Sequence, residues 1–185
     1  MKIIAFTGMP CSGKSVAVQI AKDKGIPVVR MGDAVWEETK RQGLALTDTN
    51  VGIIADSMRT KWGKDIWARR TAEKIKTLQN TEMVVIDGVR NKEEIDYFKN
   101  TVGADFLVIA IIASDEIRRK RVLSRGREDD STTVKDFEER DKRELRWGLK
   151  TVIDAADIVL SNEGSLEEFK EDMTLLLEDL MSTIE

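Results

Sequence analysis

The chain has 185 residues, of which 41% are hydrophobic and 35% are charged, and this composition predicts one folded domain with a charged surface. The formal net charge of −4 argues against a broad basic surface for nucleic acid. The absence of histidine excludes histidine acid–base catalysis, serine–histidine triads and histidine-ligated zinc. The single cysteine, Cys11, excludes an internal disulfide, and the first residues lack a signal-peptide pattern. We therefore expect a cytoplasmic protein without a membrane partner.

Four short β-branched runs and a weaker fifth predict strands that are buried on both faces of a parallel sheet, because they are apolar without alternation. These runs are Lys2 to Thr7, Pro27 to Arg30, Met83 to Asp87, Phe106 to Ala113 and Asp157 to Leu160. Helical patterns occur at Gly13 to Lys24, Asp33 to Gln42, Asn50 to Lys61, Asp65 to Gln79, Lys92 to Lys99 and Asp115 to Ser124. This alternation predicts an α/β fold with a five-stranded parallel sheet and helices on both faces.

The last quarter of the chain predicts two further helices of different character. The segment 129–146 is dense in charge, which predicts an exposed and mobile helix. Its expected pairs at i,i+4 spacing are Glu138 with Lys142 and Glu139 with Arg143. Ser165 and Glu168 have the spacing of a capping box and precede apolar residues at helical spacing. We therefore expect an amphipathic terminal helix that packs on the sheet or on another subunit.

The segment from Gly8 to Ser15, with the sequence GMPCSGKS, follows the first predicted strand and opens the first predicted helix. In this context the pattern G-x-x-x-x-G-K-[ST] predicts a phosphate-binding loop (P-loop). Lys14 is expected to neutralise the β- and γ-phosphates of a nucleoside triphosphate, and the Ser15 hydroxyl to bind Mg²⁺. The alternative is a glycine turn that only caps a helix, but this needs neither the lysine nor the serine. Cys11 is either an activated thiol or, as we prefer, a small residue in a crowded turn.

Polar residues near the ends of the second and third predicted strands extend the expected site. Asp33 follows the second strand and is either a helix N-cap or a group that faces a second ligand. Asp87 ends the third strand and can hold a water on Mg²⁺. Arg90 can bind an acceptor phosphate through two hydrogen bonds, the alternative being a surface ion pair.

Three arginines follow the fourth predicted strand. Arg121 and Arg125 are four residues apart, hence on one face of a helix, and Arg127 follows shortly after. Arginines that point to one place repel each other unless an anion lies between them, and phosphoryl transfer supplies such an anion. The alternative is a solvated basic face, which is the interpretation that we prefer for the neighbouring cations 118–120.

The motifs, taken in order, resemble those of the adenylate-kinase-like nucleoside monophosphate kinases, and particularly of the small archaeal adenylate kinase-related or dephospho-CoA-kinase-like proteins. The resemblance rests on the P-loop, Gly32-Asp33, Asp87-Gly88-Val89-Arg90, Asp115 with arginines six and ten residues later, and Arg127-x-Asp129-Asp130. It implies a three-layer P-loop NTPase fold. It also implies an acceptor-binding helical insertion at about 33–80 and a short lid with a mobile helix at about 125–146.

The motifs and the resemblance together assign four sets of site residues. The expected catalytic residues are Lys14, Asp33, Arg90, Arg121, Arg125 and Arg127. ATP is expected to contact Gly8, Met9, Pro10, Cys11, Ser12, Gly13, Lys14, Ser15, Val16, Arg121, Asn162 and Gly164; the resemblance implies that Arg121 and the turn at 156–164 lie near the adenine. The acceptor is expected to contact Gly32, Asp33, Trp36, Arg59, Gly88 and Arg90. Ser15 and Asp87 are the expected Mg²⁺ residues.

The sequence departs from the resembled family in three places. Trp36 stands where the family has an arginine, so that another arginine must bind the acceptor phosphate, with Arg30, Arg59 and Arg69 as candidates. Arg90 comes one residue early and without the family's proline. There is no room for a long lid. These departures leave the identity of the acceptor open.

The sequence thus predicts a kinase that transfers the γ-phosphate of ATP, with Mg²⁺, to a small acceptor, with a nucleoside monophosphate such as AMP as the first candidate. A phosphate acceptor needs no general base, because its nucleophile is already anionic. A hydroxyl acceptor such as dephospho-CoA needs one, and Asp33 is the expected base. Two other classes remain open, namely an ATP-dependent switch that acts on a protein or ribonucleoprotein, and a nucleotide sensor. The oligomeric state is also open.

Overall fold

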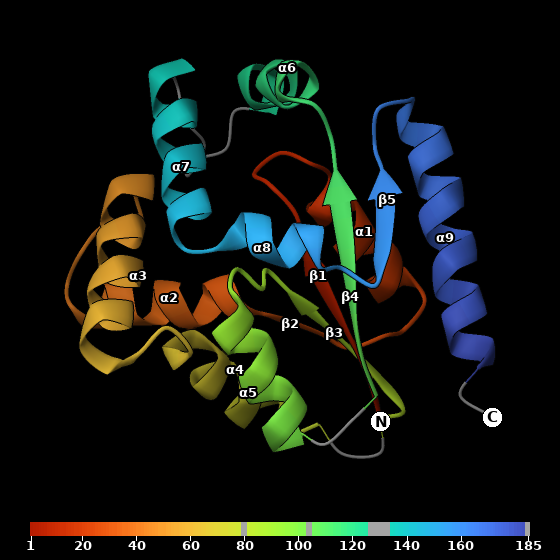
Figure 1. Cartoon of the computed structure of the whole chain (residues 1–185), viewed down its shortest axis with the longest axis horizontal. Coiled ribbons are helices and arrows are strands. Elements are labelled where there is room, and N and C mark those ends of the chain that lie inside the picture. Colours follow the sequence, from red (N-terminus) through yellow and green to blue (C-terminus); the bar gives the residue numbers. More distant parts are fainter. Residues whose placement is uncertain (79–80, 103–104, 126–133, 184–185) are drawn as a thin grey trace.

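The computed structural model describes residues 1–78, 81–102, 105–125 and 134–183, and its centre is a five-stranded parallel sheet in the order β2-β3-β1-β4-β5 (Figure 1). The strands are β1 Lys2–Thr7, β2 Val28–Arg30, β3 Met83–Asp87, β4 Asp105–Ile112 and β5 Ile158–Ser161. Each predicted strand is therefore present, with bounds that move by one residue at most. The predicted fold class, a three-layer α/β P-loop fold, is confirmed.

Helices surround this sheet in the described part of the chain. They are α1 Lys14–Asp23, α2 Met31–Arg41, α3 Asp48–Trp62, α4 Ile66–Lys76, α5 Lys92–Val102, α6 Asp115–Arg125, α7 Val134–Arg146, α8 Leu149–Asp154 and α9 Leu166–Ser182. The short helix α8 was not predicted, because its six residues are too few to show a helical period. None of the helices that the structure describes is both long and apolar enough to span a membrane.

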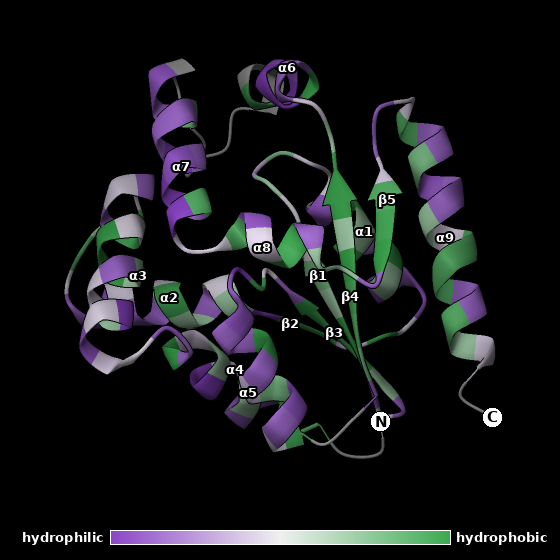
Figure 2. Ribbon diagram, in the orientation of Figure 1, coloured by the Kyte–Doolittle hydropathy of each residue, from purple (hydrophilic) through white to green (hydrophobic). Residues whose placement is uncertain are grey.

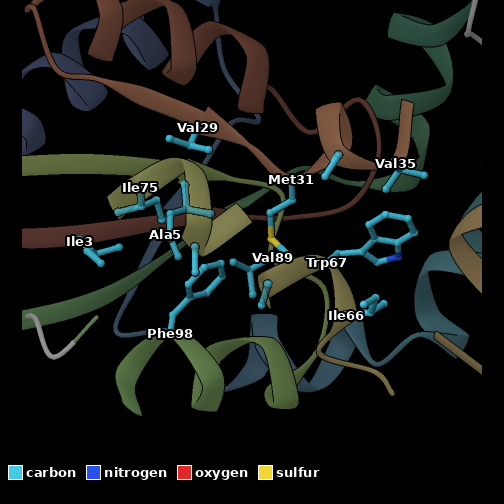
Figure 3. Packing of buried hydrophobic residues seen from close by; sticks show 14 of the residues in the cluster. Ile3, Ala5, Val29, Met31, Val35, Ile66, Trp67, Ile75, Val89 and Phe98 are labelled. Carbon is cyan, nitrogen blue, oxygen red and sulfur yellow. The ribbon is translucent and has the colours of Figure 1, made fainter. Parts of the chain in front are cut away.

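Alternate residues of the strands point to opposite faces of the sheet and form two apolar clusters. Ile3 and Ala5 of β1 face the side on which α2, α3, α4 and α5 pack, shown in Figure 3. Ile4 and Phe6 face the side covered by α1 and α9. The strands are accordingly apolar along their length, as the colours of Figure 2 show. Burial on both faces explains why the strand segments are apolar without alternation.

Two helix starts differ in how well the sequence predicted them. The capping box of α9 is confirmed, because the Ser165 side chain accepts a hydrogen bond from the Glu168 N–H and the Glu168 carboxylate accepts one in return. The alternative in which Asp33 is the N-cap of α2 is contradicted. Helix α2 begins at Met31, directly after β2, so that Arg30 is the N-cap and Asp33 lies inside the first turn. The first residue of the helix, Met31, is apolar and packs in the core.

Helix α7 makes contacts that its sequence did not predict. It stands beside α3 and α6 at the carboxyl ends of the strands (Figure 1). The expected pairs within the helix are replaced by pairs to other elements, from Glu138 to Arg119 and from Arg143 to Asp48. The expectation of an exposed helix is also wrong in part, because Phe137 and Glu144 are buried.

Arg118 joins α7 to the P-loop. Its guanidinium donates hydrogen bonds to the carbonyl of Pro10, to both carboxylate oxygens of Asp141 in α7 and to Asp115. The side chain is only 2% exposed. The interpretation of Arg118 as part of a solvated basic face is therefore wrong, although Lys120, which is 73% exposed and pairs with Glu116, fits it.

Replacement of Arg118 by methionine should destabilise the fold, because it leaves Asp141 and the Pro10 carbonyl without their shared donor. We expect a loss of about 3 kcal/mol in the free energy of unfolding, measured by urea denaturation. The matched control is Lys120→Met on the same helix, which should change it by about 0.5 kcal/mol or less. Equal losses in the two variants would contradict a structural role for Arg118.

Glu38 should make the fold sensitive to acid. Hydrogen bonds from Arg41, and then from Gln42 and Arg70, lower the pKa of Glu38 from 4.5 to about 2 despite its burial. A lowered folded-state pKa stabilises the protein above about pH 4.5, and this stabilisation is lost as the pH falls toward 2.

The melting temperature of Glu38→Gln should therefore fall less steeply between pH 5 and pH 2 than that of the unmodified protein. The adjacent variant Glu37→Gln is the control, because Glu37 is 64% exposed and pairs only with Lys74 among the described residues. If the melting temperatures of Glu38→Gln and the unmodified protein fell equally with pH, this account would be refuted.

Candidate functional site

The predicted P-loop connects β1 to α1, and two of its glycines are required by their surroundings. Gly8 has φ 142° and Gly13 has φ 116°, which are backbone angles that side chains disfavour. A Cβ on Gly8 would lie 2.2 Å from the Ile111 carbonyl oxygen, and one on Gly13 would lie 2.1 Å from the side-chain nitrogen of Asn162. The loop thus has the closely packed backbone that can surround a phosphate group with N–H donors.

Asn162 and Arg121 hold the loop by hydrogen bonds to its backbone. The Asn162 amide donates a hydrogen bond of 2.8 Å to the Ser12 carbonyl, and the Arg121 guanidinium donates one of 3.4 Å to the same oxygen. Arg121 also donates to the backbone and side-chain oxygens of Asn162, each at 3.0 Å. Gly164, which was predicted to bind the nucleotide, lies instead beside the Glu168 carboxylate at the start of α9.

Lys14 bends back onto its own loop. Its ammonium group donates hydrogen bonds to the carbonyls of Gly8 at 2.6 Å and Met9 at 2.9 Å. Burial lowers the pKa of Lys14 from 10.5 to about 8; nearby Asp87 opposes this shift and Arg90 adds to it. An anion in the loop would therefore replace two carbonyl partners and favour the charged form of the lysine.

Asp87 lies beside the loop because β1 and β3 are neighbours, with Phe6 opposite Asp87 in the register. Its Oδ2 atom is 3.5 Å from the Arg30 Nε atom. Its Oδ1 atom is buried and has no hydrogen-bond partner among the described residues. One carboxylate oxygen without a partner, together with the nearby Ser15 hydroxyl, suits Mg²⁺, which takes few protein oxygens when it is bound to phosphates.

Two adjoining cavities lie at this edge of the sheet. The loop cavity, of about 130 Å³, is lined by Gly8, Pro10, Cys11, Gly13, Lys14, Ser15, Arg30, Gly32, Asp87, Gly88, Val89, Arg90, Arg140, Glu144 and Leu149. The tryptophan cavity, of about 100 Å³, is lined by Arg30, Met31, Gly32, Val35, Trp36, Asp48, Val51, Gly52, Ala55, Arg59, Trp67, Arg90, Arg140, Arg143, Glu144 and Trp147. The residues common to both are Arg30, Gly32, Arg90, Arg140 and Glu144.

An ion pair between Arg90 and Glu144 forms part of this common wall. The Arg90 Nε atom donates a hydrogen bond of 2.7 Å to Glu144, and its Nη1 atom donates one of 2.6 Å to the Gly88 carbonyl. Burial by itself raises the pKa of Glu144, but Arg90 and Arg140 lower it below its usual value. Glu144 is therefore a charged carboxylate inside the site. Glu144 is not among the predicted site residues, because no local sequence pattern distinguishes one glutamate from the others in a charge-rich helix.

Positive charge predominates in the two cavities. Six of their lining residues are cationic, namely Lys14, Arg30, Arg59, Arg90, Arg140 and Arg143, whereas three are acidic, namely Asp48, Asp87 and Glu144. The chain as a whole carries a net charge of −4. The cavities therefore concentrate positive charge against the overall charge of the protein, which favours anionic ligands.

The tryptophan cavity combines aromatic walls with arginine donors. The Arg59 guanidinium lies over the Trp147 ring, 4.4 Å from its centroid, and pairs with the buried Glu94 at 3.0 Å. The Nε and Nη1 atoms of Arg59 are buried without a hydrogen-bond partner among the described residues. Arg30, which lines both cavities, lies over Trp36 at 5.5 Å. Of the three arginines considered in place of the one missing at Trp36, Arg30 and Arg59 line this cavity.

Several predicted site residues lie elsewhere. Arg69 hydrogen-bonds to Asp65 and to the Trp62 carbonyl and lines neither cavity. Asp33 lines neither cavity; its side chain is 43% exposed and lies 3.7 Å from Arg30. The Arg125 side chain, Arg127 and the lid motif at 127–130 lie outside the described residues. Met9, Ser12 and Val16 belong to the loop or the first turn of α1 without lining its cavity.

Comparison with known proteins shows the family of the chain. Residues 7–138 match the family model described as an AAA domain. A UPF0200 protein of Methanosarcina barkeri is 42% identical over 181 residues, which cover 98% of this chain and 97% of the relative. A UPF0200/UPF0201 protein of Archaeoglobus fulgidus is 45% identical over 186 residues, but the chain spans only 58% of its length.

Solved structures share the fold at lower sequence identity. TT1252 from Thermus thermophilus has a TM-score of 0.61 at 22% identity, over 96% of this chain and 97% of that one. A shikimate kinase from Bacteroides thetaiotaomicron has a TM-score of 0.61 at 14% identity, over 97% and 98% of the two chains. The fold is thus that of P-loop kinases. By its sequence, the chain belongs to the AAA-domain family matched over residues 7–138 and to the UPF0200 family.

Proposed function

We propose that the protein transfers the terminal phosphate of ATP, with Mg²⁺, to a small phosphate-bearing acceptor, and that a nucleoside monophosphate such as AMP is the first candidate. The observation that carries this proposal is the junction of the loop cavity with the tryptophan cavity at Arg30, Gly32 and Arg90. A site that only bound or hydrolysed a nucleotide would need the first cavity alone. The solved structures titled as shikimate kinases and a gluconokinase add support for transfer to a small molecule.

The loop cavity suits the phosphate chain of the donor. The glycine backbone and the start of α1 direct N–H groups toward it, and Lys14 can leave its two carbonyl partners to neutralise phosphate oxygens. Ser15 and Asp87 are the oxygen ligands that would hold Mg²⁺. That ion, when bound, withdraws negative charge from the phosphates. We place the base of ATP near Arg121, as the resemblance to the nucleoside monophosphate kinases implies.

The tryptophan cavity suits a flat acceptor with an anionic group. Trp36, Trp67 and Trp147 can contact a ring, whereas Arg59 has two buried N–H donors that lack a partner within the described residues. Arg90 and Arg30 lie where the two cavities meet, so they can contact the acceptor and the transferred phosphoryl group together. In the proposed reaction these arginines stabilise the charge that spreads over the phosphoryl oxygens.

The position of Asp33 favours a phosphate acceptor over a hydroxyl acceptor. A phosphate oxygen is already anionic and attacks without loss of a proton, so position and charge suffice. A hydroxyl needs a base within hydrogen-bonding reach, but Asp33, the base expected for that case, lines neither cavity. The carboxylates of Asp87 in the loop cavity and Glu144 at the junction already pair with Arg30 and Arg90. We therefore rank dephospho-CoA below the monophosphates.

A transfer assay tests this function. The protein is incubated with Mg²⁺ and γ-labelled ATP, together with AMP, CMP, UMP, GMP or dephospho-CoA, and the labelled products are separated. We expect label on at least one monophosphate. In Lys14→Ala the rate should fall about 100-fold or more, because one charge that stabilises the transition state is lost.

The matched control is Lys22→Ala, because Lys22 is an exposed lysine in the last turn of the same helix and should leave the rate unchanged. ATP hydrolysis without transfer to any acceptor would reject the kinase and favour a nucleotide-dependent switch. Transfer to dephospho-CoA alone would reject the phosphate acceptor while keeping the kinase.

A further inference from the structure

The wall between the two cavities contains a carboxylate where a kinase of this kind should bind an anion. Glu144 accepts the 2.7 Å hydrogen bond of Arg90, is 6% exposed and lines both cavities. Under the proposed function, Arg90 has to contact phosphate oxygens of the acceptor. In the structure the Arg90 Nε atom instead donates its hydrogen bond to the Glu144 side chain.

Arg90 is held in position by the loop after β3 and pairs with a carboxylate on α7. Its backbone N–H donates to Glu94 at 2.7 Å, and its Nη1 atom donates to the Gly88 carbonyl, so that the loop after β3 determines its position. Glu144 comes from α7, which lies 54 residues further along the chain. The guanidinium can therefore remain in place if the partner on α7 is exchanged.

Glu94, the other glutamate near Arg90, behaves differently. It is fully buried, lines neither cavity, pairs with Arg59 and accepts the Arg90 N–H; its own N–H donates to Asn91. Removal of Glu94 would break several internal contacts at once. Glu144, in contrast, lines both cavities, and among the described residues it accepts a hydrogen bond from Arg90.

Helix α7 is anchored by the buried ion pair of Asp141 with Arg118, whereas the turn that carries Glu144 is held by other polar contacts. Among its described side chains, Phe137 is the apolar one that is buried, and it belongs to neither core cluster. The contacts of the helix with α3 are ion pairs, from Arg143 to Asp48 at 2.8 Å and from Arg146 to Asp56 at 2.6 Å. The Arg146–Asp56 pair is exposed, and exposed ion pairs cost less to rearrange than a packed apolar interface, so the turn around Glu144 can adjust while Asp141 stays bound to Arg118.

We propose that, in the ligand-free protein, the Glu144 carboxylate occupies the position on Arg90 at which the acceptor's phosphate group binds. A phosphate-bearing acceptor then displaces Glu144. This inference rests on the proposed function for the acceptor's identity. Displacement leaves Arg30, Arg90 and Arg140 on the common wall. Three guanidiniums are better neutralised by a phosphate with two negative charges than by one carboxylate. Glu144 thereby selects against weaker anions, since each ligand must compete with it.

Binding of inorganic phosphate tests this inference without any turnover. Titration calorimetry is carried out in a Lys14→Ala background, which weakens phosphate binding to the P-loop. The added change Glu144→Gln should tighten phosphate binding about tenfold, because the competing carboxylate is gone. Glu144→Asp keeps the charge but shortens the side chain, so it should give a smaller gain and carries the test if the glutamine variant does not fold.

Two further variants show whether the increase in phosphate affinity arises at Arg90. Glu138→Gln is the matched control on the same helix; Glu138 is 44% exposed and pairs with Arg119, so phosphate binding should stay unchanged. Arg90→Met combined with Glu144→Gln should abolish the gain. Phosphate binding that is equal or weaker in both Glu144 variants, or a gain that survives without Arg90, would overturn the inference. Because the assay needs neither ATP nor transfer, its failure is distinguishable from failure of the kinase function.

Discussion

The arrangement of the site depends on positive charge that is concentrated inside a protein of net charge −4. Lys14, Arg30 and Arg90 come from three segments that the parallel sheet brings to one edge, and Arg59, Arg140 and Arg143 approach from the helices. Buried charges are costly unless they are paired. The protein reduces this cost with Glu94, Asp48, Asp87 and Glu144, and with the loop carbonyls that hold Lys14. A ligand can replace the partners that face the cavities, namely Glu144 and the loop carbonyls bound to Lys14.

Helix α7 connects the two halves of the site. Asp141 binds Arg118, which in turn holds the Pro10 carbonyl of the P-loop. One turn further on, Glu144 holds Arg90 at the junction. A ligand that moves the loop or displaces Glu144 therefore acts on the same helix.

The sequence predicted the parts of this structure whose signal is local. Apolar runs specify β1, β3 and β4, and the GMPCSGKS segment with its strand-to-helix context specifies the loop. The arginine contacts could not be predicted in this way, because they join residues that are far apart in the chain. Arg90 and Glu144 are 54 positions apart, and Arg118 and Pro10 are 108 apart. Asp33 shows the opposite case: its local pattern is typical of a cap, but helix α2 begins two residues earlier, at the buried Met31, and Asp33 lines neither cavity.

The central claim is that two joined cavities hold two phosphate groups, one in the P-loop and one on Arg90. A crystal structure of the protein with ADP, Mg²⁺ and inorganic phosphate tests this most directly. We predict separate electron density for the diphosphate in the loop of Gly8 to Ser15 and for a phosphate on Arg90, with the Glu144 carboxylate moved away. Density in the loop alone, with the Arg90 to Glu144 bond intact at saturating phosphate, would contradict the account.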